Sequence, residues 1–404
     1  MKLKPLTALK NINGRRVLVR CDFDVPLGRK TMRKKNTSAK QRGKFEIKDD
    51  TRLEACLPTI QYLLKNKARV ILIGHLGRPK GQVVPELSLL PAKDYLAKML
   101  KHPVTLIPLE RYIGEAPARA AKQMKAGDLI MLENVRFSDR EELNCHRFAK
   151  ALAALADVYI NEAFSVSHRP ASSVSAVREY LPSYAGFHLQ EEIDKLSLAL
   201  KKPTHPLTLI IGGAKIETKL PVIKQFIGSA EHILVGGAVA NDFFKALGYE
   251  VGTSLIDEEY IQDASSILEK ISQVKTELIL PVDVEVSNGK KSIIREPFAV
   301  HPKEMILDIG PKTIKLYQSI IKKSKMIIWN GPLGKFEEAK FSQGTKRIAA
   351  ALQSSQAKVL VGGGETGELF KTKGKTKLRR NIFASVGGGA MLEFLASKKL
   401  PGLN

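Results

Sequence analysis

The chain has 404 residues, which is more than one hydrophobic core usually holds, so we expect two domains. Apolar residues make up 44% of the sequence, but no apolar run is long enough to span a membrane, so we exclude a membrane protein. The three cysteines form no CxxC pair, which excludes a disulfide framework and a zinc site. The N-terminus lacks an apolar signal, so we expect a cytoplasmic protein. The net charge of +24 is concentrated in residues 28–44 and 371–380, so the remaining chain is only moderately basic.

Short apolar runs alternate with amphipathic segments along the chain. The runs predict strands at residues 16–21, 69–74, 128–132, 157–161, 207–212, 232–236, 326–330 and 358–362. The amphipathic segments predict helices at residues 52–65, 141–155, 187–202, 258–272 and 342–352. Continuous apolar strands separated by helices are typical of parallel sheets covered on both faces, so we expect a doubly wound α/β fold, formed twice. The interrupted segment 179–186 (EYLPSYAG) is the predicted domain boundary.

Cationic and hydrogen-bonding residues follow several predicted strands of the first half. They are Arg20, Asp22, Asp24, Arg52, His75, Arg78, Arg136, His168 and Arg169. Residues just past the carboxyl ends of parallel strands line the binding crevice of an open sheet, and arginine grips phosphate or carboxylate through two parallel hydrogen bonds. Each arginine alone is more often an ion-pair residue on the surface, but the whole set predicts a pocket for an anionic substrate.

Glycine-rich turns follow the predicted strands of the second half. The two most informative stretches are 211–219 (IGGAKIETK) and 383–390 (FASVGGGA), each expected to pass from a strand through a turn into a helix. Such turns bring backbone N–H groups and a helix N-terminus close to phosphate. Lys215 and Lys219 are four residues apart, which predicts both ammonium groups on one face of that first helix. The chain has neither GxxxxGK[ST] nor a strand-proximal GxGxxG, so P-loop and dinucleotide sites lose support.

The two basic segments allow two interpretations. Residues 28–44 hold eight Lys or Arg and residues 371–380 hold six, with no acid in either, so the rest of the chain carries 24 − 14 = +10. Solvated surface loops are the ordinary interpretation, and the composition of 28–44 favours disorder. The alternative is weak polyanion contact, which would be electrostatic and nonspecific because no aromatic side chains are interleaved.

Ten collinear segments resemble phosphoglycerate kinases from one end of the chain to the other. They are 20–27 (RCDFDVPL), 51–60 (TRLEACLPTI), 74–79 (GHLGRP), 132–137 (LENVRF), 157–173 (DVYINEAFSVSHRPASS), 212–219 (GGAKIETK), 308–313 (DIGPKT), 329–337 (WNGPLGKFE), 362–366 (GGGET) and 387–401 (GGGAMLEFLASKKLP). The resemblance implies two Rossmann-like parallel-sheet domains joined by a hinge. Residues 1–182, with a C-terminal return of 391–404, would bind 3-phosphoglycerate, and residues 186–390 would bind the nucleotide.

The reaction implied by this resemblance is reversible, Mg²⁺-dependent phosphoryl transfer between ATP and the carboxylate of 3-phosphoglycerate. The products are 1,3-bisphosphoglycerate and ADP, in glycolysis and gluconeogenesis. Because a carboxylate nucleophile is already ionised at neutral pH, the site needs charge stabilisation rather than a general base. We expect a monomer, since no coiled coil or apolar stripe indicates assembly.

The resemblance also assigns residues to roles. The substrate positions are the nine residues of the anionic pocket named above. The nucleotide positions are Gly213, Lys215, Lys219, Gly237, Asn330, Glu337, Gly364, Glu365 and Thr366, with Glu365 beside Mg²⁺ as Mg-ATP or Mg-ADP. The catalytic positions are Arg52, Lys215, Lys219, Gly387, Gly388 and Gly389, which would offset the repulsion between two anions.

Several residues depart from the family's usual pattern. Asp24 stands where Asn is usual, Glu365 where Asp is usual, and Ala171 where a second histidine is usual. Glu162, Ser165 and Val386 replace an Asp, a Gly and a Thr. Asp24 adds a negative charge beside an anionic substrate, so we expect Asp24→Asn to leave activity intact or to improve substrate affinity.

Overall fold

The computed structural model describes residues 3–29, 45–109, 113–370 and 378–404, apart from the side chains of Arg29, Glu365 and Glu368. The chain divides into two compact units: unit 1 is residues 1–193 with 399–404, and unit 2 is residues 194–398. Helix α6 (Phe187–Lys201) contains the division between them, whereas the sequence-based boundary lies just before this helix. No helix in the described ranges is long and apolar enough to cross a membrane.

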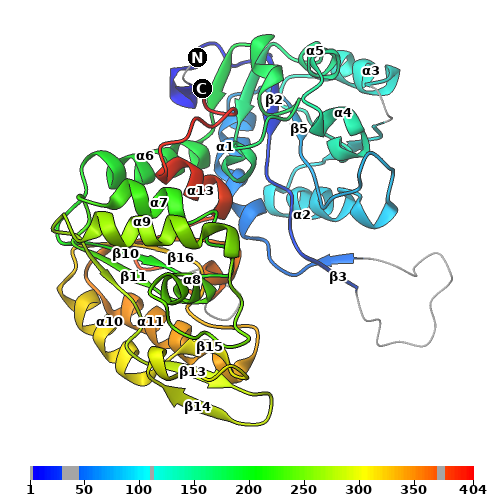
Figure 1. The fold of residues 1–404 in the computed structure, drawn as a ribbon. Helices are drawn as coiled ribbons and strands as arrows, with labels where there is room; N and C mark the ends of the chain where they lie inside the picture. The colour runs from blue at the N-terminus through cyan, green and yellow to red at the C-terminus, as the bar shows by residue number, and fades with distance from the viewer. Residues whose placement is uncertain (1–2, 30–44, 110–112, 371–377) are drawn as a thin grey trace. The chain divides into compact units, whose positions relative to one another are not determined.

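Unit 1 contains a parallel sheet with the strand order β1-β9-β8-β2-β5-β7-β6 (Figure 1). Its strands are β1 (Lys4–Pro5), β2 (Arg16–Arg20), β5 (Arg69–Ile73), β6 (Thr105–Ile107), β7 (Leu129–Leu132), β8 (Val158–Asn161) and β9 (Ser183–Ala185). Its other helices are α1 (Thr51–Lys65), α2 (Leu90–Leu100), α3 (Glu115–Gln123), α4 (Asp139–Glu142) and α5 (His146–Ala153). The central strands β2, β5, β7 and β8 match the apolar runs of the sequence within one residue at each end.

The alternation of side chains along β2 explains why helices cover both faces of this sheet. Val17 and Val19 enter one hydrophobic core together with Ile60 of α1, whereas Leu18 enters a second core with Phe148 of α5. Successive strand residues point to opposite faces, so a strand that is apolar at every position needs a packed layer on each side.

The predicted helix 141–155 is wrong in its continuity. Helix α4 ends at Glu142 and α5 begins at His146, with Asn144 between them at φ 50°. Asn tolerates this left-handed conformation better than most residues and therefore breaks the helix, although the apolar period continues through the break.

Unit 2 contains a second parallel sheet with the order β12-β11-β10-β16-β17-β18. Its strands are β10 (Leu207–Ile211), β11 (His232–Val235), β12 (Glu277–Ile279), β16 (Met326–Asn330), β17 (Lys358–Gly362) and β18 (Ile382–Ser385). Its helices are α7 (Leu220–Phe226), α8 (Ala238–Ala246), α9 (Ile261–Ile271), α10 (Pro311–Lys323), α11 (Gln343–Ser354), α12 (Gly364–Glu368) and α13 (Gly388–Leu395). Figure 1 shows α7 and α9 on one side of the sheet and α10 and α11 on the other, so the α/β fold with two parallel sheets is confirmed.

Two antiparallel elements were not predicted. In unit 2, β13 (Val284–Ser287), β14 (Ser292–Arg295) and β15 (Met305–Ile309) form a separate sheet of order β14-β13-β15. In unit 1, β3 (Leu27–Arg29) pairs with β4 (Phe45–Ile47) outside the parallel sheet (Figure 1). The sequence also predicted that the two basic segments are solvated loops or polyanion contacts. Apart from the ends of these segments, that prediction concerns residues 30–44 and 371–377, which lie outside the described residues.

The last residues of the chain pack on unit 1. Gly402 donates its N–H to the carbonyl of Ser167 at 2.8 Å and accepts from Asn161 Nδ2 at 3.1 Å, and Arg178 donates to the carbonyls of Pro401 and Asn404. The sequence-based limits divided helix α13 at residue 391 and placed its later residues in this return, whereas the whole helix belongs to unit 2.

A buried carboxyl group holds the start of α6. Glu162 is 1% exposed and accepts from Thr59 Oγ1 at 2.7 Å and from the N–H groups of His188 and Leu189 at 3.1 and 3.3 Å. Burial raises the pKa of Glu162 to about 8, although these hydrogen bonds act in the opposite direction.

This carboxyl group should make folding stability depend on pH. Between about pH 4.3, the usual pKa of an unfolded Glu, and pH 8 the native state holds a proton that the unfolded state has released, so the free energy of unfolding falls as pH rises. We expect Glu162→Gln to reduce this decline, by on the order of a few kcal/mol across the window. Urea unfolding at a series of pH values measures it, with the exposed Glu86→Gln as control, and parallel profiles for Glu162→Gln and the unsubstituted chain would contradict the expectation.

Candidate functional site

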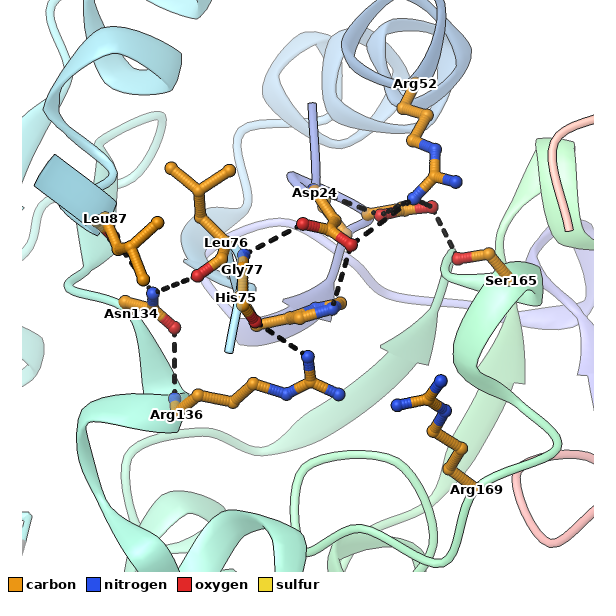
Figure 2. A network of polar contacts seen from close by, with 12 residues as sticks. Asp24, Arg52, His75, Leu76, Gly77, Leu87, Asn134, Arg136, Ser165 and Arg169 are labelled. Atoms are coloured by element: carbon orange, nitrogen blue, oxygen red, sulfur yellow. Dashed lines mark hydrogen bonds and ion pairs between the residues drawn. The ribbon is translucent and has the colours of Figure 1, made fainter. Parts of the chain in front are cut away.

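The carboxyl ends of the unit 1 strands bring several of the predicted anion-binding residues together (Figure 2). Arg20 is the last residue of β2, His75 follows β5, Arg136 follows β7 and Arg169 follows β8. Arg52 comes from the first turn of α1. Because all these strands are parallel, their carboxyl ends meet at one edge, which is the usual position of a ligand site in an open α/β sheet.

Two carboxylates hold the guanidinium group of Arg52. Its Nη1 lies 3.2 and 3.1 Å from Oδ1 and Oδ2 of Asp22, and 3.9 Å from Oδ2 of Asp24. Ser165 donates its hydroxyl to Asp22, which is 4% exposed. Asp22 is therefore a buried carboxylate that positions the guanidinium group of Arg52. The contribution of Ser165 was not predicted, because the sequence analysis noted this residue only as a departure from the family pattern.

Arg20 fixes the ring of His75. Arg20 is 1% exposed, and its Nη2 lies 3.0 Å from His75 Nδ1, while its Nε donates to Ser173 Oγ at 2.8 Å. An arginine can only donate, so Nδ1 accepts and the ring proton belongs on Nε2. Burial, together with the charges of the surrounding arginines, holds the pKa of His75 well below its usual range, so the ring is neutral.

Arg136 is held by the turn that follows β5. Its Nη1 donates to the carbonyl of Gly77 at 2.8 Å, and its Nε lies 3.3 Å from Glu142 Oε1. Asn134 accepts from the N–H of Arg136 and donates to the carbonyl of Leu76, so one amide ties the two loops together (Figure 2). Burial lowers the pKa of Arg136, and Glu142 opposes that effect.

The other predicted residues of unit 1 are less tightly held. Arg169 is half-buried and its Nε lies 3.4 Å from Nε2 of the neighbouring His168. Arg78 is exposed on the turn after His75. Asn134, Gly77 and Ser165 make polar contacts in the cluster but were not among the predicted site residues. The signal for Gly77 and Asn134 was their position in segments that follow predicted strands, and Ser165 was noted only as a departure from the family pattern.

In unit 2 the prediction for the two lysines is wrong. Residues 212–219 form bends and a turn, and α7 begins only at Leu220, so Lys215 and Lys219 do not share a helical face. Pro221 lies in the first turn of α7, which is where proline is favoured, and was the signal for this later start. Lys215 is exposed, whereas Lys219 is 8% exposed and donates to Asn330 Oδ1.

The glycine turns of unit 2 pack so closely that side chains cannot be added. A Cβ atom on Gly237 would lie 2.7 Å from the N of Gly213 and 2.8 Å from the carbonyl oxygen of Pro332, and Gly237 has φ 62°. A Cβ on Gly331 would lie 2.3 Å from the carbonyl oxygen of Gly212. These glycines therefore bring the ends of β10, β11 and β16 into direct backbone contact.

A cavity of about 290 Å³ opens beside these turns. Of the predicted nucleotide-binding residues, Gly213, Gly237 and Glu337 line it. Its wall also contains apolar residues that the sequence analysis did not assign: Leu255, Pro281, Val284, Met305, Leu307 and Leu333. Several come from β13 and β15, and the alternating sequence VEVS of β13 was the available strand signal. An apolar slot edged by backbone polar groups suits a flat heterocyclic ring.

The remaining predicted residues lie at the starts of α12 and α13. A Cβ on Gly388 would lie 2.9 Å from Cα of Gly363, so the two turns adjoin. Thr366 donates to the carbonyl of Gly362 at 2.6 Å, and Gly364 has open space where its Cβ would be. Gly387 precedes α13, and Gly388 and Gly389 are its first residues, as expected. The side chain of Glu365 lies outside the described part.

Substitution of Gly237 tests the contribution of this close packing. We expect Gly237→Ala to raise the KM for nucleotide about tenfold or more, since the new methyl group must displace the backbone at Gly213 and Pro332 and takes a strained positive φ. The matched control is Gly248→Ala, which also has a positive φ, 81°, but open space at the Cβ position. Nucleotide titration of both variants measures the difference, and equal effects would show that backbone strain alone is responsible.

Comparisons with known proteins agree over nearly the whole chain. The family model described as phosphoglycerate kinase matches residues 6–398. A phosphoglycerate kinase of Clostridium kluyveri is 39% identical, covering 98% of this chain and 96% of its own length, and one of Thermosipho africanus is 41% identical, covering 97% and 95%. Among solved structures, phosphoglycerate kinase from Coxiella burnetii superposes with a TM-score of 0.82 at 35% identity, and that from Pyrococcus horikoshii with 0.81 at 28%; each comparison covers 99% of this chain and 98% of the other.

Proposed function

Because this chain belongs to the phosphoglycerate kinase family, we propose that the arginine cluster of unit 1 binds 3-phosphoglycerate and that the cavity of unit 2 binds the nucleotide. Family membership makes the chain a kinase of glycolysis that transfers a phosphoryl group to the carboxyl group of 3-phosphoglycerate. The observation that carries the assignment of sites is the convergence of Arg52, Arg136 and Arg169 at one sheet edge (Figure 2). Arg20, the last residue of β2, joins them through its contact with His75.

In unit 1 the arginines would neutralise the phosphate and carboxylate of the substrate. Guanidinium groups that are already held by Asp22, Gly77 and Ser173 lose little side-chain entropy on binding, so the positive charge is preorganised. The neutral His75 would contribute a hydrogen bond rather than a charge.

In unit 2 the apolar wall of the cavity would hold the base, and Glu337 at its edge would reach the sugar. Lys219, Asn330 and Thr366 would lie along the phosphates, with the N–H groups of Gly387, Gly388 and Gly389 at the start of α13 facing the transferring group. Support comes from the hydrogen bond of Lys219 to Asn330 and from the adjoining turns at Gly363 and Gly388.

Magnesium would enter with the nucleotide as Mg-ATP or Mg-ADP. Among the described residues no group of three or more acidic, His or Cys side chains could hold a metal by itself. Mg²⁺ commonly takes most of its ligands from phosphate and water with one or two carboxylates. The start of α12, where Gly364 has open space at its Cβ position and Glu365 follows, fits an ion that enters bound to the phosphates. When bound, the ion would neutralise charge on the phosphate oxygens.

The chemistry requires positioning and charge stabilisation rather than a base. Arg52, Lys215 and Lys219 would offset the repulsion between the carboxylate and the transferring phosphoryl group. Because the two proposed sites belong to different units, we expect hinge closure to bring the ligands together and to exclude water, which would otherwise accept the phosphoryl group.

The test is turnover of Mg-ATP with 3-phosphoglycerate, coupled to reduction of the 1,3-bisphosphoglycerate formed. We expect turnover that depends on all three of 3-phosphoglycerate, ATP and Mg²⁺. Failure of turnover with nucleotide binding retained would overturn the assignment and favour a binding protein that has lost catalysis.

Three further expectations from the sequence stay predictions. A monomer is checked by light scattering after gel filtration, and a cytoplasmic location by fractionation of the source cells. Weak polyanion contact through 28–44 and 371–380 predicts binding to heparin that falls steeply with salt, and a salt-independent affinity would contradict it.

A further inference from the structure

We propose that Asp24 is a built-in counterion that the substrate must displace from Arg52 and His75, so that this residue sets the affinity of unit 1 for its anionic substrate. The proposal rests on the function proposed above. It goes further by assigning to Asp24 a competitive role instead of a supporting contact.

The position of Asp24 differs from that of Asp22, although both lie near Arg52. The side chain of Asp24 is 40% exposed, whereas that of Asp22 is 5% exposed. Asp22 lies 3.1 Å from the guanidinium group and Asp24 lies 3.9 Å from it (Figure 2). Arg52 is therefore held from inside by one acid, and a second, looser acid covers it on the accessible side.

The same carboxylate faces His75. Oδ2 of Asp24 lies 3.7 Å from His75 Nε2, which carries the ring proton because Nδ1 accepts from Arg20. Oδ1 of Asp24 accepts the N–H of Gly77 at 2.8 Å, and this bond keeps Oδ2 turned toward Arg52 and His75. Asp24 therefore places a carboxylate oxygen at ion-pair distance, beyond hydrogen-bond reach, from the donors of two residues that an anionic ligand would use.

An anion that enters the cluster meets this carboxylate. A phosphate or carboxylate oxygen that approaches Arg52 and His75 must take the place of Oδ2, and the two negative charges repel each other at a distance where solvent screens them only partly. Asparagine at this position would keep an oxygen for the N–H of Gly77 and would present an N–H donor, instead of a negative oxygen, to the ligand.

The variant Asp24→Asn tests the proposal directly. We expect its Kd for 3-phosphoglycerate, measured by calorimetry, and its inhibition constant for sulfate to fall together by about three- to tenfold, the effect of removing one partly screened charge. We expect the Kd for ADP to stay constant, because Asp24 belongs to unit 1 and the proposed nucleotide site to unit 2.

Glu142→Gln is the matched control for charge. The side chain of Glu142 is 44% exposed, close to the 40% of Asp24, and its substitution by Gln removes one negative charge from the cluster, as Asp24→Asn does. Glu142, however, pairs with Nε of Arg136 and does not lie between Arg52 and His75. We expect a clearly smaller change in both constants. An equal effect in Glu142→Gln, or an unchanged or weaker affinity in Asp24→Asn, would overturn the proposal. The absence of turnover in the unsubstituted chain would instead overturn the proposed function, because the binding constants are measured without turnover.

Discussion

Lys215→Ala is expected to lower kcat about 100- to 1000-fold while the KM for ATP changes by less than about threefold, the signature of a contact made in the transition state. Lys215 is exposed on the bend that follows β10, and within the described ranges no acid forms an ion pair with it. Its ammonium group is therefore available to follow the phosphoryl group during transfer. Lys219, by contrast, is bound to Asn330, which suits a contact that persists in the ground state.

Steady-state kinetics with varied ATP separates the two parameters. Lys224→Ala is the matched control, because Lys224 is also an exposed lysine of this region but pairs with Asp263 at 2.6 Å. We expect it to keep its activity. Equal losses in kcat and in nucleotide affinity for Lys215→Ala would remove the transition-state role.

Arg52→Ala is expected to reduce kcat/KM for 3-phosphoglycerate by about 100- to 1000-fold. The substitution removes the guanidinium group that Asp22 holds in place and leaves that buried carboxylate without its ion-pair partner. Arg52→Lys keeps the charge but not the planar fork, so we expect it to recover only part of the loss.

The control for this loss is Arg16→Ala. Arg16 lies at the opposite end of β2 from Arg20 and pairs with Asp157 at 2.6 Å, so its removal costs an ion pair away from the carboxyl-end cluster. Activity assays with varied 3-phosphoglycerate, together with thermal unfolding of both variants, distinguish a catalytic loss from a folding defect. If Arg16→Ala lost as much activity as Arg52→Ala, a specific role for Arg52 would be untenable.

The sequence alone was sufficient for the central strands of both sheets. β16 and β17 have the predicted bounds, because strands buried on both faces are continuous apolar runs whose ends are marked by polar residues or glycine. The same logic placed Arg20 and His75 at strand ends. The resemblance of collinear segments to one family added the activity, which the comparisons support.

Other features depended on contacts between segments that are distant in the chain. The close packing of Gly213 against Gly331 and Gly237 joins residues that are far apart in the chain, and nothing in the local sequence indicated it. The later start of α7 did have a local signal in Pro221, although the spacing of the two lysines suggested a helix. The apolar wall of the cavity is built from β13 and β15, whose short antiparallel strands leave only a weak periodic signal.

Asp24 illustrates most clearly what only the tertiary structure decided. In the sequence it is an acid where the family usually has an amide. Its negative charge alone predicts that it weakens the affinity for an anionic substrate. Its mechanism depends on the N–H of Gly77, the ring of His75 and the guanidinium group of Arg52, which come from another loop and from α1. Electrostatic interactions depend on distance and burial, and neither quantity is encoded in local sequence, so the competition at this site became visible only once the chain was folded.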